Sequence, residues 1–187
     1  MPAKVVFVGK DGQLHPIDKL FSTDKLESTL VVIEYFHHEI HHENAFTANR
    51  TVTHGTGASP NILIVTPNTS TRAHLFFQAV SDAAVTLTVY EEADYAGGTA
   101  LPSYNRDRNS TKDSALTVTY DATDSGGGKG TAIWVFSGGA NKEIVMSNRE
   151  HMEFILRRNT KYLIETVGTS GDIITMLTDW YEHKEMR

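Results

Sequence analysis

Short apolar runs separated by turn-forming residues recur from residue 61 onward, and this pattern constrains the fold more than any other feature of the sequence. Such runs are typical of the strands of a β-sandwich or barrel, and no helix-period stretch of comparable length competes. The spacing predicts about eight or nine strands. The runs are residues 62–66, 73–80, 85–90, 116–120, 132–136, 143–146, 152–156, 162–167 and 173–180.

Two of these runs alternate between apolar and polar side chains. In residues 85–90 three aliphatic side chains alternate with two threonines and a tyrosine, and residues 116–120 follow a similar pattern. Successive side chains of a strand point to opposite faces, so each strand has one buried and one wetter face. We therefore predict an all-β fold, a jelly-roll-like antiparallel β-sandwich. The long loops at residues 94–114 and 121–130 are the expected location of a binding surface.

The first part of the chain is predicted to be an extension. It holds strand candidates at residues 5–8 and 30–36, but most of it is polar and too irregular to bury a core alone. We predict an N-terminal extended arm of residues 1–53 and a sandwich domain of residues 54–187. An arm that becomes ordered on neighbouring chains needs apolar anchors. The aromatic candidates for an interface are Phe7, Phe21, Tyr35 and Phe36.

Charge and composition narrow the choice of partners. The formal net charge is −6 at pH 7, so no uniform positive field attracts phosphate backbones or anionic lipid. The sequence has no cysteine, which excludes disulfides, thiolate metal sites and thiol nucleophiles. No apolar run approaches the roughly 20 residues of a membrane helix. We expect neither a nucleic-acid nor a membrane partner.

The motif with the most chemical content is His38-Glu39-Ile40-His41-His42, which matches the zinc-hydrolase pattern H-E-x-x-H. That chemistry needs a helix, whereas the β-branched and aromatic residues just before it favour a strand. In a strand, His38 and His42 lie about 13 Å apart, too far to share one ion. Ala45 and Ala48 occupy the Gly and His positions of the extended metalloprotease pattern. A hydrolase and assembly-related metal binding stay open as alternatives.

The favoured interpretation of this segment is a polar protein interface formed by His37, His38, His41 and His42, with no metal and no cofactor. The sequence also lacks the G-x-S-x-G elbow and the G-x-x-x-x-G-K-[ST] phosphate loop. We therefore predict that the protein is not an enzyme.

A second candidate interface is the loop around Arg106 and Arg108. Two guanidinium groups, with the asparagines beside them, suit contacts with carboxylates or carbonyls of a neighbouring subunit. A solvated loop stabilised by Asn and Asp turns explains the same residues equally well.

Several strings together resemble a family of tailed-phage virion proteins. They are His37-His38-Glu39-Ile40-His41, Ile64-Val65-Thr66-Pro67-Asn68-Thr69, Arg72-Ala73-His74-Leu75, Leu87-Thr88-Val89-Tyr90-Glu91, Asn105-Arg106-Asp107-Arg108-Asn109-Ser110 and Asp179-Trp180-Tyr181-Glu182-His183. The resemblance extends from about residue 30 to residue 183. Any one string alone is weak, whereas several in the same order are moderately specific.

The resemblance implies a capsid decoration, or cement, protein that stabilises an icosahedral head. Its partner would be the major capsid protein, on the outer surface of the virion capsid, and the protein would be made in the host cytoplasm. Local three-fold positions on such shells favour a homotrimer. The family brings no catalytic residues. The alternative is a glycan- or receptor-binding β-sandwich of a virion fibre or tail.

Overall fold

The computed structural model describes residues 6–8, 14–16, 35–55, 59–138 and 153–184. The chain separates into two compact units, Met1–Tyr35 and Phe36–Arg187. In the first unit, strand β1 (Val6–Val8) pairs antiparallel with β2 (Leu14–Pro16), and Phe7 lies opposite His15. Phe21 lies outside the described residues, as does the predicted strand at residues 143–146.

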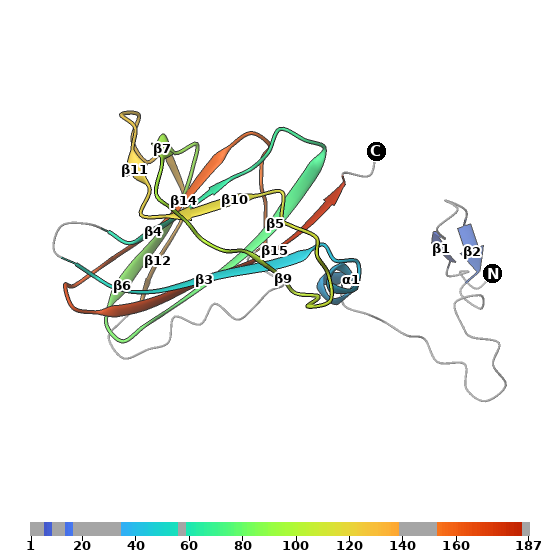
Figure 1. Ribbon diagram of the computed structural model, residues 1–187, viewed down its shortest axis with the longest axis horizontal. Coiled ribbons are helices and arrows are strands. Elements are labelled where there is room, and N and C mark those ends of the chain that lie inside the picture. Colours follow the sequence, from blue (N-terminus) through green and yellow to red (C-terminus); the bar gives the residue numbers. More distant parts are fainter. Residues whose placement is uncertain (1–5, 9–13, 17–34, 56–58, 139–152, 185–187) are drawn as a thin grey trace, which may run out of the picture. The chain divides into compact units, whose positions relative to one another are not determined.

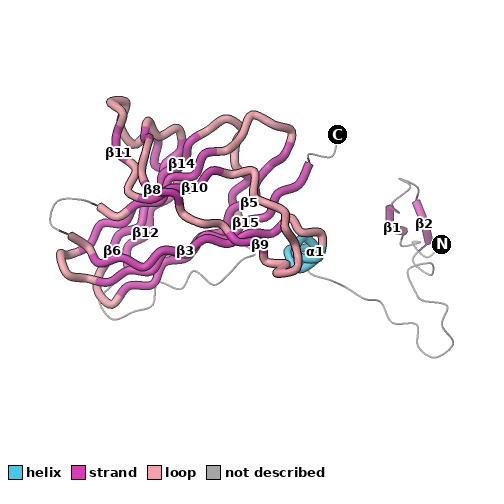
Figure 2. The backbone as a smooth tube through the Cα atoms, viewed as in Figure 1, coloured by secondary structure: helices cyan, strands magenta, loops and turns pink. Residues whose placement is uncertain are grey.

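The second unit is built from two antiparallel sheets with a small additional ribbon (Figures 1 and 2). The larger sheet has the order β12 (Thr131–Gly138), β6 (Val85–Glu91), β14 (Lys161–Gly168), β4 (Asn61–Val65), β10 (Thr117–Tyr120) and β8 (Thr99–Ala100). The other sheet has the order β13 (Phe154–Ile155), β5 (Thr71–Ser81), β15 (Ile173–Lys184), β3 (Ala45–Thr53) and β9 (Tyr104–Asn105). The ribbon pairs β11 (Thr123–Asp124) with β7 (Tyr95–Ala96).

The main core lies between the two large sheets. Alternate residues of β6 (Val85, Leu87 and Val89) are buried there with Phe46 and Trp180 from the other sheet. Burial of such apolar side chains is the main driving force for folding. The prediction of an all-β, sandwich-like fold of antiparallel sheets is confirmed. Among the described residues, no helix is long and apolar enough to cross a membrane.

The predicted strand that runs into the histidine segment is wrong at its C-terminal end, because Tyr35–His41 forms helix α1. Phe36 and Ile40 are four residues apart, so a helix places both on one face. That face packs on Phe76 and Tyr181 of the five-stranded sheet, while His37 and His41 on the helix are exposed. Tertiary packing therefore outweighs the local preference for strand.

The second unit begins earlier in the chain than the sandwich domain predicted to start at residue 54. Strand β3 pairs with β15 along its full length, from Ala45 opposite Tyr181 to Thr53 opposite Ile173. Its first four residues show the burial expected of a central strand. Residues 45–53 therefore belong to the sandwich and not to an extended arm.

A glycine in the β11–β12 loop gives a direct test of this packing. At Gly130 the φ angle is +79°, and an added Cβ atom would lie 2.2 Å from the carbonyl oxygen of Glu91. Gly128 has a similar φ of +83°, but nothing lies within 4 Å of its added Cβ atom. We expect Gly128→Ala to cost about 1–2 kcal/mol of unfolding free energy from backbone strain alone. Gly130→Ala should cost more, because its added Cβ atom also clashes with the backbone of Glu91. Glu91 pairs with Thr131 at one end of the β6–β12 ladder, so the clash would disturb that pairing.

Chemical denaturation of both variants measures the difference. Equal losses of unfolding free energy would show that the backbone at the β6–β12 ladder moves to accommodate the extra atom at no cost.

Candidate functional site

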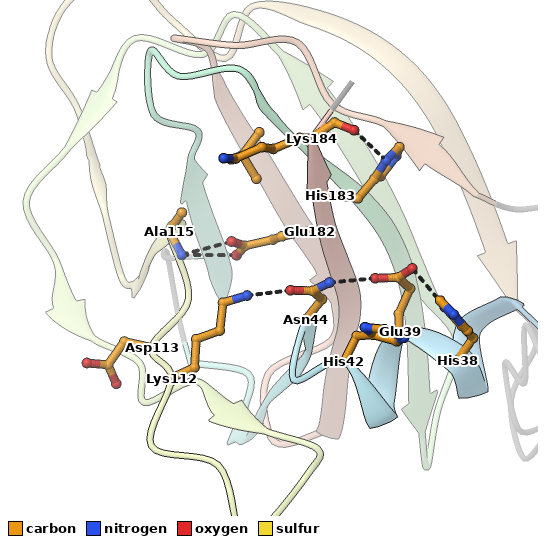
Figure 3. Close-up of a pocket in the computed structure, with 11 residues that line it drawn as sticks. His38, Glu39, His42, Asn44, Lys112, Asp113, Ala115, Glu182, His183 and Lys184 are labelled. Carbon is orange, nitrogen blue, oxygen red and sulfur yellow. Dashed lines mark hydrogen bonds and ion pairs between the residues drawn. The ribbon is translucent and has the colours of Figure 1, made fainter. Parts of the chain in front are cut away.

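An open groove of about 530 Å³ lies beside α1 at one end of the sandwich (Figure 3). Its walls come from α1 and the turn after it, the loop before β10, the first residue of β5 and the end of β15. The lining residues are His38, Glu39, His42, Asn44, Thr71, Lys112, Asp113, Ala115, Glu182, His183 and Lys184. The groove therefore carries carboxylates, amines and imidazoles together.

Glu39 is the buried carboxylate on the helix side of the groove, at 4% exposure. Its Oε2 accepts a hydrogen bond from Asn44 Nδ2 at 2.8 Å, and its Oε1 lies 3.4 Å from His38 Nδ1. Lys112 Nζ donates in turn to Asn44 Oδ1 (Figure 3). This chain of contacts ties α1 to the loop before β10.

Glu182 is the second buried carboxylate of the groove, and it is held within the fold. Its oxygens accept hydrogen bonds from the Ala115 amide at 3.0 and 3.1 Å, Ser114 Oγ at 2.6 Å and Trp180 Nε1 at 3.0 Å. A carboxylate that accepts this many bonds from its own chain is a structural acceptor that fixes the loop on β15.

Helix α1 and the turn after it bring four histidines together in pairs, including His38 and His42, which the strand interpretation placed about 13 Å apart. The rings of His38 and His42 are 4.2 Å apart at their centroids, and Nε2 of His37 lies 2.9 Å from Nε2 of His41. One condition for zinc-hydrolase chemistry, a helix at this segment, is therefore met. Within the described ranges, no group of three or more metal-ligating side chains is arranged to hold an ion.

Of the predicted aromatic anchors, Phe36 packs within its own chain, against Phe76 and Tyr181 of the five-stranded sheet. It is 5% exposed, and its ring makes edge contacts with Phe76 at 5.7 Å and Tyr181 at 6.0 Å. The structure thus places Phe36 in internal packing and not on an interface. Tyr35 is the first residue of α1, and Phe7 is the middle residue of β1.

The two arginines of the 105–110 loop have different surroundings. Arg106 Nη1 donates to Asp179 Oδ2 at 3.2 Å, and its guanidinium lies 5.1 Å from the centre of the Phe36 ring. Arg108 is exposed, and its guanidinium lies over the ring of Tyr104 at 5.6 Å. Arg106 therefore anchors the loop to β15, whereas Arg108 is the one presented to solvent.

Sequence reasoning missed a cluster on the outer face of the five-stranded sheet, next to α1. Tyr181 hydroxyl donates to Glu153 Oε1 at 2.7 Å, and His74 Nδ1 contacts the same oxygen. Nε2 of His74 lies 2.6 Å from Nε2 of His183. Burial lowers the pKa of His74, although its contact with Glu153 opposes that shift. The polar residues at alternating positions of β5 and β15 were the available clue.

Segments that are distant in the sequence thus meet around α1. Tyr181 packs against α1, and His74 stacks on Tyr181, which brings in residues 72–75 and 179–183. Arg106 lies over the ring of Phe36, which brings in residues 105–110. We call this region, formed by α1 with residues 72–75, 105–110 and 179–183, the α1 cluster.

Comparisons of the sequence and structure with protein-family models, curated proteins and solved structures give no significant match. The chemistry of the α1 cluster and of the groove is therefore what bears on function.

Proposed function

We propose that this chain is a structural virion protein, a decoration or cement protein that binds the outside of a shell of major capsid protein and stabilises the head. In this proposal it is a homotrimer with a jelly-roll-like sandwich, made in the host cytoplasm and located on the capsid surface. It binds protein and catalyses no reaction.

The observation that carries the proposal is that most of the sequence segments behind the resemblance lie close together in the fold. Four of the six strings that resemble tailed-phage virion proteins contribute to the α1 cluster, although they span residues 37 to 183 of the sequence. Chance similarities scattered along a chain have no reason to meet at one place in the fold. Their meeting around α1 supports a common structural origin of the resemblance.

The exposed part of this region has the composition of a protein interface rim. His37, His38, His41 and Arg108 are solvent-exposed donors next to a groove that also carries Lys112. Imidazole and guanidinium groups suit the carboxylates and carbonyls of a protein partner. A polar interface of this kind is suited to subunits that fold separately and then dock.

The glycan-binding alternative has less support. Sugar stacking needs an aromatic ring with an open face. Tyr104 is the large exposed aromatic among the described residues, at 51% exposure, and Arg108 lies over its ring. A glycan array with the purified protein separates this alternative from shell binding.

Deletion of residues 1–28 tests the proposal. The sandwich carries its own core from Phe36 onward, so the melting temperature should stay within a few degrees of the full-length value. Binding to undecorated shells of the major capsid protein should weaken about 10-fold or more, because linked contacts multiply one another. Co-sedimentation measures binding. Light scattering compares the full-length protein with a mass of three times 20.7 kDa, and the truncated protein with three times its own smaller chain mass.

The full-length chain is the control in each measurement. Undiminished binding by the truncated chain would show that residues 1–28 take no part in docking. If full-length protein fails to bind shells at all, the decoration proposal is wrong.

A further inference from the structure

Two histidines from adjacent strands face each other on the outer side of the five-stranded sheet. His74 lies on β5 and His183 on β15, with Tyr181 of β15 directly opposite His74. The ring centroids are 4.5 Å apart, and the two Nε2 atoms are separated by 2.6 Å. Two imidazole nitrogens this close repel each other unless one of them carries a hydrogen or a cation lies between them.

The surroundings of His74 place its hydrogen on Nδ1. Nδ1 contacts Glu153 Oε1 and lies 2.9 Å from the Tyr181 hydroxyl oxygen, whose single proton is donated to the same carboxylate oxygen. A carboxylate only accepts hydrogen bonds, so Nδ1 must supply an N–H to make this contact favourable. Neutral His74 then has a lone pair on Nε2.

His183 is fixed in the same tautomer by a different acceptor. Its Nδ1 lies 3.1 Å from the backbone carbonyl oxygen of Lys184 (Figure 3). A carbonyl also only accepts, so Nδ1 of His183 carries a hydrogen, and in the neutral ring Nε2 then carries a lone pair. With both rings neutral, the two Nε2 lone pairs face each other across 2.6 Å, an arrangement that a shared cation stabilises.

We propose that His74 and His183 bind a divalent transition-metal ion of the zinc class through their Nε2 atoms. Imidazole nitrogen is a preferred ligand of zinc, copper and nickel. Metal-bound histidines almost always donate the other ring N–H to a carboxylate or a backbone carbonyl. His74 donates to Glu153 and His183 to the Lys184 carbonyl, so both histidines have the outer-shell partner that orients a ligand.

The fit requires a small adjustment of the rings. Two Zn–N bonds of about 2.0 to 2.1 Å at a tetrahedral angle hold their nitrogens about 3.3 Å apart. Nε2 of His183 therefore moves outward by less than about 1 Å, which is feasible because this side chain lines the open groove. Over the described ranges no third ligand joins the pair. The ion keeps positions for water or for a group from another molecule.

A zinc titration of protein that carries no histidine tag tests the site, with isothermal calorimetry as the readout. The α1 histidines are a competing site, since Nε2 of His37 and His41 are 2.9 Å apart. We therefore include a variant with all four replaced, H37Q/H38Q/H41Q/H42Q. One zinc ion per chain should bind to the wild type at the proposed site and to this variant. His183→Gln should abolish that binding event, and Glu153→Gln should weaken it about 10- to 100-fold.

Long-range ¹H–¹⁵N spectra of the imidazoles provide a second readout. Zinc should shift the Nε2 resonances of His74 and His183 in the four-histidine variant, and melting curves confirm that each variant is folded. Unchanged zinc binding by His183→Gln, or its loss in the four-histidine variant, would overturn the proposal. So would the absence of stoichiometric zinc binding, which would show that the pair shares a proton instead.

Discussion

Replacing Trp180 by alanine should lower the free energy of unfolding by about 3 to 5 kcal/mol, the usual range for removal of a large buried aromatic ring. Trp180 is 0% exposed, and its ring stacks on Phe46 of the neighbouring strand at 5.9 Å. It lies on β15, the central strand of its sheet, so the cavity is flanked on both sides by paired strands and cannot close easily. For a chain of this size the melting temperature should fall by roughly 6 to 20 °C.

Trp134→Ala is the matched control for this result. Trp134 is only partly buried and lies on β12, at the edge of the six-stranded sheet. The same substitution should cost about 1 to 3 kcal/mol there, because part of the ring already contacts water. Urea denaturation measures both losses. If Trp134→Ala is as costly as Trp180→Ala, the core is not organised around the central strand β15.

The strand pattern of the sandwich was predictable because it is local. The β6 sequence alternates aliphatic side chains with two threonines and a tyrosine, so its strand character is visible without knowledge of its partners. The predicted runs at residues 62–66, 85–90 and 162–167 correspond to β4, β6 and β14. Which strands pair, and in which order, depends on contacts that local alternation does not encode.

Helix α1 and strand β3 were not predicted, because their burial depends on distant residues. Only the packing of Phe36 and Ile40 on Phe76 and Tyr181 makes a helix favourable at residues 35–41. The β3 sequence Ala-Phe-Thr-Ala-Asn-Arg-Thr-Val-Thr has few aliphatic side chains, yet Ala45 and Ala48 are fully buried. Small residues such as these are buried because large neighbouring side chains cover them.

The candidate site shows the same division between local and distant information. The histidine tract was visible as a motif, but its geometry depended on the unpredicted helix. His74 and His183 are 109 positions apart in the sequence, so their contact needs the pairing register of β5 with β15. Arg106 and Arg108 look equivalent in the sequence, whereas Asp179 holds only Arg106.

Replacing Glu182 by leucine should have the second largest effect on stability, about 3 kcal/mol of unfolding free energy. The side chain is 5% exposed, and its oxygens are the acceptors for the Ala115 amide, the Ser114 hydroxyl and the Trp180 indole N–H. Leucine has a similar size but accepts no hydrogen bond. A buried donor left without an acceptor costs about 1 to 3 kcal/mol. The substitution also removes the cost of burying a charged carboxylate, which offsets part of the loss from the unpaired donors.

Two control variants separate the hydrogen bonds from the charge and from the groove. Glu182→Gln keeps the shape and one acceptor oxygen, so it should cost about 1 kcal/mol, because neutral acceptors form weaker bonds than charged ones. Asp113 lines the same groove but is exposed, and Asp113→Leu should change stability by no more than about 0.5 kcal/mol. Combining Glu182→Leu with Trp180→Phe, which removes the indole N–H, should cost less than the sum of the two single changes. Strict additivity would mean that the Trp180–Glu182 hydrogen bond contributes nothing to the stability of the sandwich.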